Sequence, residues 1–365
     1  MVSVRVGFDA RAAFLDPHRG FGRVTRSLAA ALVRLLPGEV VLFVPHGVSV
    51  PEPWYPLAAR IVRLRRPRRG AFLFDPWAWR YALRRVPVDV LHLPAWTVPP
   101  RLPAPVVATF YDATPFRFPS PPQAWRRRRA RLAITSRARA DRVHALSRHA
   151  AAELDQFVPR RRAPAEVVHL GVDETFRPGS GAGGLRHLLF VGGGEPHKNL
   201  DLLLDALAGE GAERLPPLLV VGAAADAALE STVRRRGLAA RVRLAAPCGD
   251  GELAEHYRQA LATLVPSRNE GFGLPALEAM ACGCPVLAAD AGALPEVCGG
   301  AGRLLPSDDP AAWRAALLAL LDHPRERAAL AEAGIARARE FTWERSADGL
   351  VRLYRTLVRA DSSRI

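Results

Sequence analysis

Residues 266–286 read PSRNEGFGLPALEAMACGCPV, and this stretch decides the fold more than any other part of the chain. The apolar residues Thr263–Val265 before it predict a strand, and the glycines at positions 271 and 273 predict a tight turn. Pro275 predicts the first position of a helix, because the N–H that proline lacks has no helical partner there. A strand, a turn and a helix in this order direct backbone N–H groups and the positive helix end at one point, which suits a diphosphate.

Two carboxylates accompany this turn. Glu270 lies in the loop, and Glu278 lies about one turn into the predicted helix. We therefore expect both to border one crevice, where one accepts hydrogen bonds from sugar hydroxyls and the other from a ribose. The alternative interpretation is that Glu278 only stabilises the helix end and Glu270 faces solvent.

Residues 188–200, LLFVGGGEPHKNL, repeat the order of strand, glycine loop and helix. This loop contains Lys198, the single lysine of the chain, and Asn199, one of only two asparagines. Every other residue in the combined count of lysine and arginine is an arginine. A compact ammonium reaches a phosphate oxygen through a gap that is too narrow for a planar guanidinium, so its retention here indicates a phosphate contact.

Strand and helix signals alternate in both halves of the chain, which predicts parallel, doubly wound α/β sheets. The strands expected in the first half are Val2–Phe8, Val40–Val44, Val88–Leu93, Val106–Phe110 and Arg142–Leu146. Those of the second half are Leu188–Val191, Leu218–Val221, Val242–Ala245, Thr263–Val265 and Val286–Ala289. The Gly-rich residues 171–184 predict a linker, and Thr342–Val358 predicts a long amphipathic helix. We expect domains at residues 1–178 and 179–341, with residues 342–365 as a helix that returns to the first domain.

The net charge of +15 has three interpretations: nucleic-acid binding, docking on an anionic membrane surface, or solvated composition without a partner. The charge is concentrated in Arg60–Arg69 and Trp125–Arg142, and we favour the last two interpretations over nucleic acid.

Asp9 interrupts the N-terminal apolar run, and no apolar stretch reaches the ~18 residues of a membrane span, so we expect a cytoplasmic protein. The cysteines Cys248, Cys282, Cys284 and Cys298 are expected to be thiols, and we expect no metal site.

The Glu-x7-Glu spacing of Glu270 and Glu278, within some twenty matching residues, resembles the donor-site signature of family 4 glycosyltransferases. Members of that family are retaining enzymes with the GT-B fold. The resemblance implies two Rossmann-like domains that face each other across a cleft, with the donor bound mainly by the second and the acceptor by the first. Lys198 matches the lysine that binds the diphosphate in the family, while His197 stands where arginine is usual. Gly193 also stands where many members have arginine, and Arg268 is a candidate to supply the missing charge.

The same resemblance implies a set of site residues. The first half contributes the loop Gly20–Arg23, which resembles the glycine loop facing the diphosphate. Tyr111 stands where relatives commonly show a histidine before Asp112. Residues expected to take part in catalysis are Lys198, Glu270, Tyr111 and Asp112. Residues expected to bind the donor are Gly22, Arg23, Gly193, Gly194, His197, Arg268, Gly271, Phe272, Gly273, Leu274 and Glu278.

The implied reaction moves a hexosyl group, with mannosyl as the first expectation, from a GDP- or UDP-linked sugar to a saccharide or lipid-linked acceptor in polysaccharide or glycoconjugate assembly. No separate cofactor is expected, and catalysis is expected to be metal-independent because no Asp-x-Asp sequence occurs near a strand end. An alternative within the same fold is a nucleotide-sugar epimerase, which would need an acid/base set near the sugar. A basic nucleic-acid-binding protein would explain the charge but not the glycine loops.

Overall fold

The computed structural model describes residues 3–17, 20–50, 57–64, 71–95, 97–118, 124–161, 163–179, 186–224 and 226–362. Part of the predicted arginine run (residues 65–69), the start of the first predicted strand and most of the Gly-rich end of the linker lie outside these residues. The chain forms two compact units. The first unit comprises Met1–Phe116, Pro121–Gly171 and Thr342–Ile365, and the second comprises Arg117–Ser120 and Val172–Phe341.

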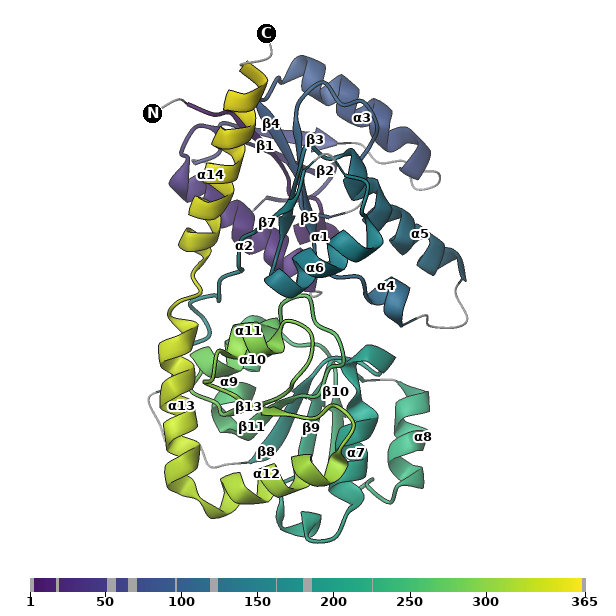
Figure 1. The fold of residues 1–365 in the computed structure, drawn as a ribbon, viewed down its shortest axis with the longest axis vertical. Helices are drawn as coiled ribbons and strands as arrows, with labels where there is room; N and C mark the ends of the chain where they lie inside the picture. Colours follow the sequence, from purple (N-terminus) through teal and green to yellow (C-terminus); the bar gives the residue numbers. More distant parts are fainter. Residues whose placement is uncertain are drawn as a thin grey trace. The chain divides into compact units, whose positions relative to one another are not determined.

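The first unit contains a seven-stranded sheet in the order β3-β2-β1-β4-β5-β6-β7, and all its strand pairs are parallel. Its strands are β1 (Val6–Asp9), β2 (Val40–Pro45), β3 (Arg60–Leu64), β4 (Val90–Leu93), β5 (Val106–Phe110), β6 (Arg142–Ala145) and β7 (Ala165–Val167). Its helices are α1 (Ala12–Leu15), α2 (Gly20–Leu35), α3 (Ala71–Arg85), α4 (Thr114–Arg117), α5 (Ala124–Thr135), α6 (Arg148–Phe157) and α14 (Trp343–Ser362) (Figure 1).

The second unit contains a six-stranded parallel sheet in the order β10-β9-β8-β11-β12-β13. Its strands are β8 (His187–Val191), β9 (Leu218–Val221), β10 (Val242–Ala245), β11 (Ala260–Val265), β12 (Val286–Ala289) and β13 (Arg303–Leu305). Its helices are α7 (Leu200–Ala208), α8 (Ala227–Arg235), α9 (Asp250–Gln259), α10 (Leu274–Ala281), α11 (Leu294–Cys298), α12 (Pro310–Asp322) and α13 (Pro324–Ala338).

Both sheets reverse their winding at one place, between β1 and β4 in the first unit and between β8 and β11 in the second. The predicted doubly wound α/β class is therefore confirmed. In such sheets, ligands bind outside the carboxyl ends of the strands at the point of reversal. The central strands are apolar on both faces, as parallel strands covered by helices must be, and every residue of β2 and β11 is buried.

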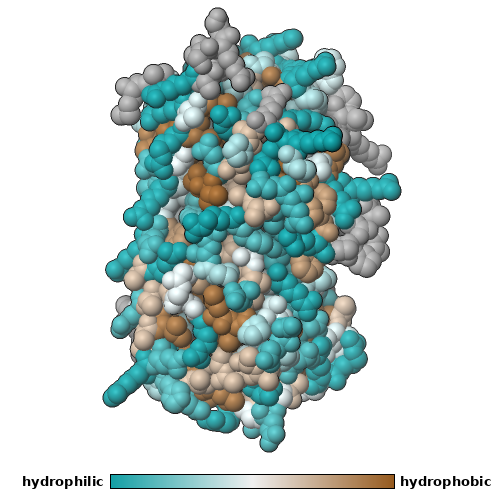
Figure 2. Space-filling view, viewed as in Figure 1, coloured by the Kyte–Doolittle hydropathy of each residue, from teal (hydrophilic) through white to brown (hydrophobic). Residues whose placement is uncertain are grey.

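The C-terminal helix α14 returns to the first unit and packs beside α2 (Figure 1). The two segments that join the units lie against each other, since a side chain at Gly171 would come within 2.2 Å of the backbone nitrogen of Trp343. Val172 likewise donates its N–H to the carbonyl of Phe341 at 3.1 Å. Among the described residues, no helix is long and apolar enough to cross a membrane. On the face shown in Figure 2, small groups of hydrophobic residues are surrounded by hydrophilic ones.

A chain of hydrogen bonds between buried side chains crosses the core of the first unit. Tyr354 of α14 contacts His92 Nδ1 at 2.6 Å, and His92 Nε2 contacts Thr109 Oγ1 at 2.8 Å. Thr109 Oγ1 also contacts His144 Nδ1 at 3.1 Å, and His144 Nε2 contacts the carbonyl oxygen of Val168 at 2.8 Å.

The carbonyl oxygen of Val168, the last acceptor in this series of hydrogen bonds, determines which atom carries each proton. A carbonyl oxygen only accepts, so His144 carries its proton on Nε2 and accepts from Thr109 at Nδ1. The hydroxyl of Thr109 then accepts from His92 Nε2, and Tyr354 donates to His92 Nδ1. Both imidazoles are neutral in this arrangement. Burial is the main cause that lowers the pKa of His92 well below its ordinary value, and burial lowers the pKa of His144 to about 4.

Candidate active site

The two glycine loops identified in the sequence meet at the reversal point of the second unit. One loop follows β8 and the other follows β11, and these strands are direct neighbours in the sheet. Arg268 donates its backbone N–H to the carbonyl of His197 at 2.8 Å, which joins the loops. The amide of Asn199 donates to the carbonyls of Pro266 at 3.1 Å and Ser307 at 2.8 Å. Asn199 has a φ of 58°, a left-handed conformation that asparagine tolerates better than most residues.

Lys198 and Glu270 form an ion pair between these loops. The ammonium of Lys198 lies 2.7 Å from Glu270 Oε1, and the hydroxyl of Ser267 donates to the same oxygen at 2.7 Å. Burial acts to raise the pKa of Glu270, but Lys198, Ser267 and the nearby His197 outweigh it, so the pKa is below its ordinary value. The carboxylate is therefore ionised at neutral pH. The loop backbone is fixed as well, because Ala293 donates its N–H to the carbonyl of Glu270 at 3.0 Å.

The helix after the second loop begins one residue earlier than the sequence predicts. α10 starts at Leu274, so Pro275 is its second residue, and Gly273 is the residue at the N-cap. Gly273 has a φ of 102°, and a side chain there would meet Leu294 at 2.8 Å, so glycine is required at this turn. The loop residues Gly271 and Phe272 are buried, and Leu274 is partly exposed. The positive end of α10 is thus placed at the carboxyl end of β11.

Glu278 is more enclosed than expected. Its side chain is part of the buried face of α10, with 2% of the residue exposed, and Oε2 accepts a hydrogen bond from the hydroxyl of Tyr257 at 3.0 Å. Tyr257 is itself fully buried, at the end of α9. The sequence did not identify Tyr257, because nothing local links it to a residue 21 positions away.

The remaining predicted residues of this unit lie in the same two loops. Gly193 is adjacent to Glu195, whose carboxylate a side chain at position 193 would meet at 2.8 Å. Gly194 and Arg268 are exposed, and His197 is partly buried. Arg268 is therefore a cation on the loop that faces His197, and its guanidinium is accessible to a ligand.

The predicted residues of the first unit lie near the carboxyl ends of β1 and β5. Gly22 is packed so closely in α2 that a side chain there would come within 1.9 Å of the carbonyl oxygen of Asp16. Arg23, the next residue, is partly buried. The hydroxyl oxygen of Tyr111 is buried, and burial raises the pKa of this phenol although Thr25 and Arg137 act against it. Tyr111 is therefore a neutral hydroxyl.

Asp112 and Asp9 are both held by neighbouring groups. Asp112 Oδ1 accepts the backbone N–H of Thr114 at 2.8 Å, at the start of α4. Asp9 and Arg11 form a buried two-bond ion pair, with Arg11 Nε and Nη2 each 2.8 Å from one carboxylate oxygen. Arg11 also lies over the ring of Trp79 at 5.1 Å. The charges at the end of β1 thus fix the first loop.

Comparison with solved structures identifies the class of fold. The chain is similar to a sucrose-phosphate synthase from Thermosynechococcus elongatus, with 23% sequence identity and a TM-score of 0.77, over 97% of this chain and 99% of the other. It is also similar to Alr3699/HepE of Anabaena, solved in complex with UDP and glucose, with 17% identity and a TM-score of 0.73, over 97% of this chain and 100% of the other. The fold is GT-B, as the sequence predicts.

Two family models match the sequence. Residues 18–176 match the model described as Glycosyltransferase Family 4, and residues 186–323 match the model described as Glycosyl transferases group 1. The chain belongs to the family 4 glycosyltransferases.

Curated relatives include the D-inositol 3-phosphate glycosyltransferases of Segniliparus rotundus and Thermobifida fusca. The first is 38% identical over 242 residues, which are 61% of this chain and 54% of the relative. The second is 37% identical over 240 residues, which are 59% of this chain and 55% of the relative. The chain thus spans about half the length of the curated relatives that it matches.

Proposed function

We propose that this protein transfers a hexosyl group from a nucleotide-diphosphate sugar to a saccharide or lipid-linked acceptor, with retention at the anomeric carbon. The observation that carries the proposal is the Lys198–Glu270 pair at the reversal point of the second sheet, where α/β sheets bind their ligands. Membership of the family supports the same reaction. Both family models describe glycosyltransferases, and no observation favours the epimerase alternative.

Lys198 is proposed to stabilise the departing diphosphate. An ammonium has three N–H donors, and the contact with Glu270 uses one of them. The positive charge of Lys198 and the positive end of α10 can together attract phosphate oxygens. Fixed charges of this kind stabilise negative charge as it develops, which is the usual task of a divalent cation. We therefore propose that the departure of the diphosphate needs no metal ion.

Glu270 is proposed to hold the sugar. Lys198 and Ser267 both bind Oε1, so Oε2 can accept hydrogen bonds from sugar hydroxyls. The reacting carbon becomes oxocarbenium-like as the bond to the diphosphate loosens. For retention, the acceptor attacks the face that the diphosphate leaves, and a diphosphate oxygen takes the proton of the acceptor hydroxyl. Glu278, with Tyr257 behind it, is proposed to bind the ribose.

The first unit is proposed to supply the remaining contacts. Tyr111 is a neutral phenol that can hydrogen-bond a sugar hydroxyl, and Asp112 follows it on the same loop. Gly22 and Arg23 lie at the start of α2, whose N-terminal turn suits an anion. A mannosyl donor remains our first expectation. The names of the curated relatives add D-inositol 3-phosphate as an acceptor to test, and the Anabaena complexes add UDP-linked donors.

Radiolabelled donors test the function directly. The full chain is incubated with a panel of UDP- and GDP-linked hexoses, with D-inositol 3-phosphate, free saccharides or a lipid-linked saccharide as acceptors. We expect label transfer with one donor, or slow hydrolysis of that donor without an acceptor, and NMR of the product should show a retained anomeric configuration. Glu270→Gln, checked for folding by circular dichroism, should lose this turnover. Epimerised donor without transfer, or no turnover with any donor, would contradict the proposal.

We also propose that the first unit contacts an anionic membrane surface. Trp77 and Tyr81 are one turn apart on α3, and they are 69% and 58% exposed. The guanidinium of Arg80 lies 5.9 Å from the ring centre of Trp77, and that of Arg85 lies 4.3 Å from that of Tyr81. Aromatic rings with arginines beside them are typical of the interface between lipid and water.

A basic pocket lies beside this helix. It has a volume of about 610 Å³, and its lining from β3 and α3 includes Arg60, Arg63 and Arg85. Such a pocket suits an anionic lipid headgroup, and each basic residue near the surface contributes about 1 kcal/mol. Sedimentation with liposomes tests this: Trp77→Ala/Tyr81→Ala should reduce binding to anionic vesicles at low salt. Equal binding to neutral and anionic vesicles would contradict the proposal and would indicate that the basic residues are solvated and have no specific partner.

A further inference from the structure

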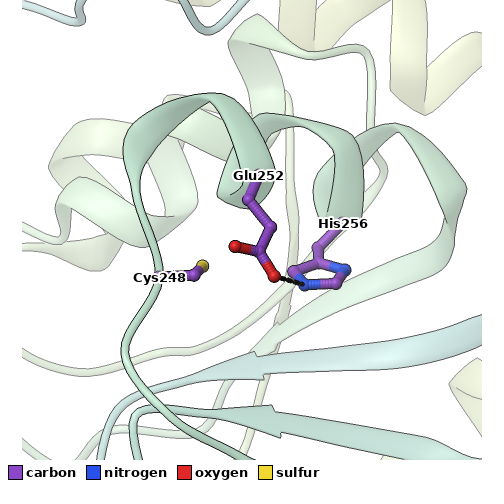
Figure 3. A group of neighbouring side chains, drawn as sticks. All are labelled: Cys248, Glu252 and His256. Carbon is purple, nitrogen blue, oxygen red and sulfur yellow. Dashed lines mark ion pairs between the residues drawn. The ribbon is translucent and has the colours of Figure 1, made fainter.

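Three metal-ligating side chains of different chemistry gather at the start of α9, in the second unit (Figure 3). Cys248 lies on the loop before the helix, and Glu252 and His256 lie on the helix. The residues are spaced four apart, and the α-helical repeat of 3.6 residues places Glu252 and His256 on one face. One ligand atom of each lies within 4.8 Å of the others, and Glu252 Oε1 lies 3.8 Å from His256 Nε2.

These distances are close to the edges of a metal tetrahedron. With metal–ligand bonds of about 2.0–2.3 Å, two ligand atoms on a tetrahedral zinc ion are roughly 3.3–3.6 Å apart. The observed separation of Glu252 and His256 is slightly longer than this, and a small side-chain rotation would remove the difference. We propose that Cys248, Glu252 and His256 bind a borderline-soft divalent cation such as Zn²⁺, with the fourth position open to solvent.

The ligand chemistry selects the class of ion. Magnesium and calcium prefer oxygen ligands, whereas a thiolate with an imidazole favours zinc and its neighbours in the transition series. Cys248 is the partly exposed cysteine, while Cys282, Cys284 and Cys298 are buried. Burial raises the pKa of each of these three thiols to about 12, so they remain protonated and do not compete for the ion.

Neighbouring residues already contact the backbone and the ring of His256. His187 of β8 donates from Nε2 to the backbone carbonyl of His256 at 3.0 Å, and its ring stands edge-on to the His256 ring at 5.8 Å. Tyr257, the next residue of α9, binds Glu278. A bound ion would therefore join the loop after β10 to the helix that positions Glu278. Lys198 and Glu270 are not among the proposed ligands, so the ion is not part of the proposed centre of transfer. The proposal departs from the sequence-based expectation of no metal site, which did not consider the Cys-x3-Glu-x3-His spacing.

Cobalt provides a direct test, because a thiolate bound to Co²⁺ absorbs in the near ultraviolet and tetrahedral Co²⁺ absorbs strongly in the visible. The full chain is freed of metal with a chelator, which is then removed, and is titrated with Co²⁺. We expect both sets of bands to saturate at one equivalent and to disappear when Zn²⁺ is added. The Cys248→Ser variant should lose the thiolate band, and His256→Gln and Glu252→Gln should require much more Co²⁺.

Two controls separate binding from folding. Glu255→Gln removes a carboxylate from the exposed face of the same helix and should leave the titration unchanged. Circular dichroism in metal-free buffer should be the same for all variants, since the three ligands lie at or near the surface. A titration without a thiolate band, or a band that persists in Cys248→Ser, would overturn the proposal. Neither result depends on transferase activity, so the test is independent of the proposed function.

Discussion

The two units wind their sheets in the same way, yet they use the reversal point differently. In the second unit, the loops there present an ion pair that is still accessible: the side chains of Lys198 and Glu270 are 20% and 12% exposed. In the first unit, the ion pair after β1 is closed, since the side chains of Arg11 and Asp9 are 4% and 1% exposed. One pair is accessible to solvent, and the other fixes its own loop. The same scaffold thus holds an accessible ion pair in one unit and an enclosed ion pair in the other.

Replacing Lys198 should give the largest effect on this comparison. Lys198→Ala should lower turnover on the order of 10²–10³-fold, the scale for removing one preorganised stabiliser of developing charge. Lys198→Arg should fall between Ala and wild type, because a planar guanidinium does not fit the contacts of a compact ammonium. Steady-state kinetics with the donor that the radiolabelled panel identifies measures the turnover of both variants.

A surface cation of the same unit is the control for Lys198. Arg234 on α8 is well exposed, and Arg234→Ala should leave turnover unchanged. The melting temperature of the Lys198 variants should stay close to that of wild type. A Lys198→Arg enzyme with wild-type kinetics would mean that the retained lysine has no special role.

Acid should weaken the first unit more than the second, because burial lowers the pKa of two described histidines there, His92 and His144, and of one, His187, in the second unit. The pKa of His144 is about 4 in the folded protein and about 6.5 when unfolded, so the unfolded chain binds more protons between these values. The free energy of unfolding should therefore fall as pH falls from 6.5 towards 4, by about 1.4 kcal/mol per pH unit for this group. His92, whose pKa is also lowered, adds to the loss.

Denaturant unfolding at pH 7, 6 and 5 measures this slope, with near-ultraviolet signals assigned to each unit. The His144→Gln variant retains a donor towards Val168 but cannot titrate, and it should reduce the slope. His323→Gln changes an exposed histidine of the second unit and should not reduce it. If wild type and His144→Gln lose stability equally on acidification, the protonation of His144 is not the cause of the loss.

Much of the fold was predictable because its strands are continuous apolar runs between turn residues. Strands such as β5 and β9 match the predicted ranges, and β11 starts only three residues earlier than predicted. β3 was not predicted, because arginines at positions 60 and 63 interrupt its apolar residues at the edge of the sheet. β7 and β13, of three residues each, are too short to give a pattern.

The candidate site was predictable only where its geometry is local. Gly273 is fixed by a turn that the sequence itself displays, and Lys198 stood out as the single lysine. The contact between Lys198 and Glu270 depends on β8 and β11 being neighbours, which the order of strands in the chain does not reveal. Tyr257 behind Glu278, and Tyr354 on His92, likewise join residues that only the folded sheets bring together.

These two tyrosines give the finest test of the difference between the units. Both are fully buried, and each donates its hydroxyl to one acceptor: Tyr257 to Glu278 at 3.0 Å and Tyr354 to His92 at 2.6 Å. Removing either hydroxyl costs one hydrogen bond, about 0.5–1.5 kcal/mol. Tyr257→Phe leaves Glu278 less firmly held, so it should raise the Kd of the donor several-fold while the turnover number changes little. Tyr354→Phe should lower the free energy of unfolding by a similar amount and leave that Kd unchanged. Calorimetric titration with the donor measures Kd for both variants, and denaturant unfolding measures their free energies of unfolding. Equal effects on Kd would show that the two hydroxyls serve only the general stability of the protein, and that Glu278 owes nothing particular to Tyr257.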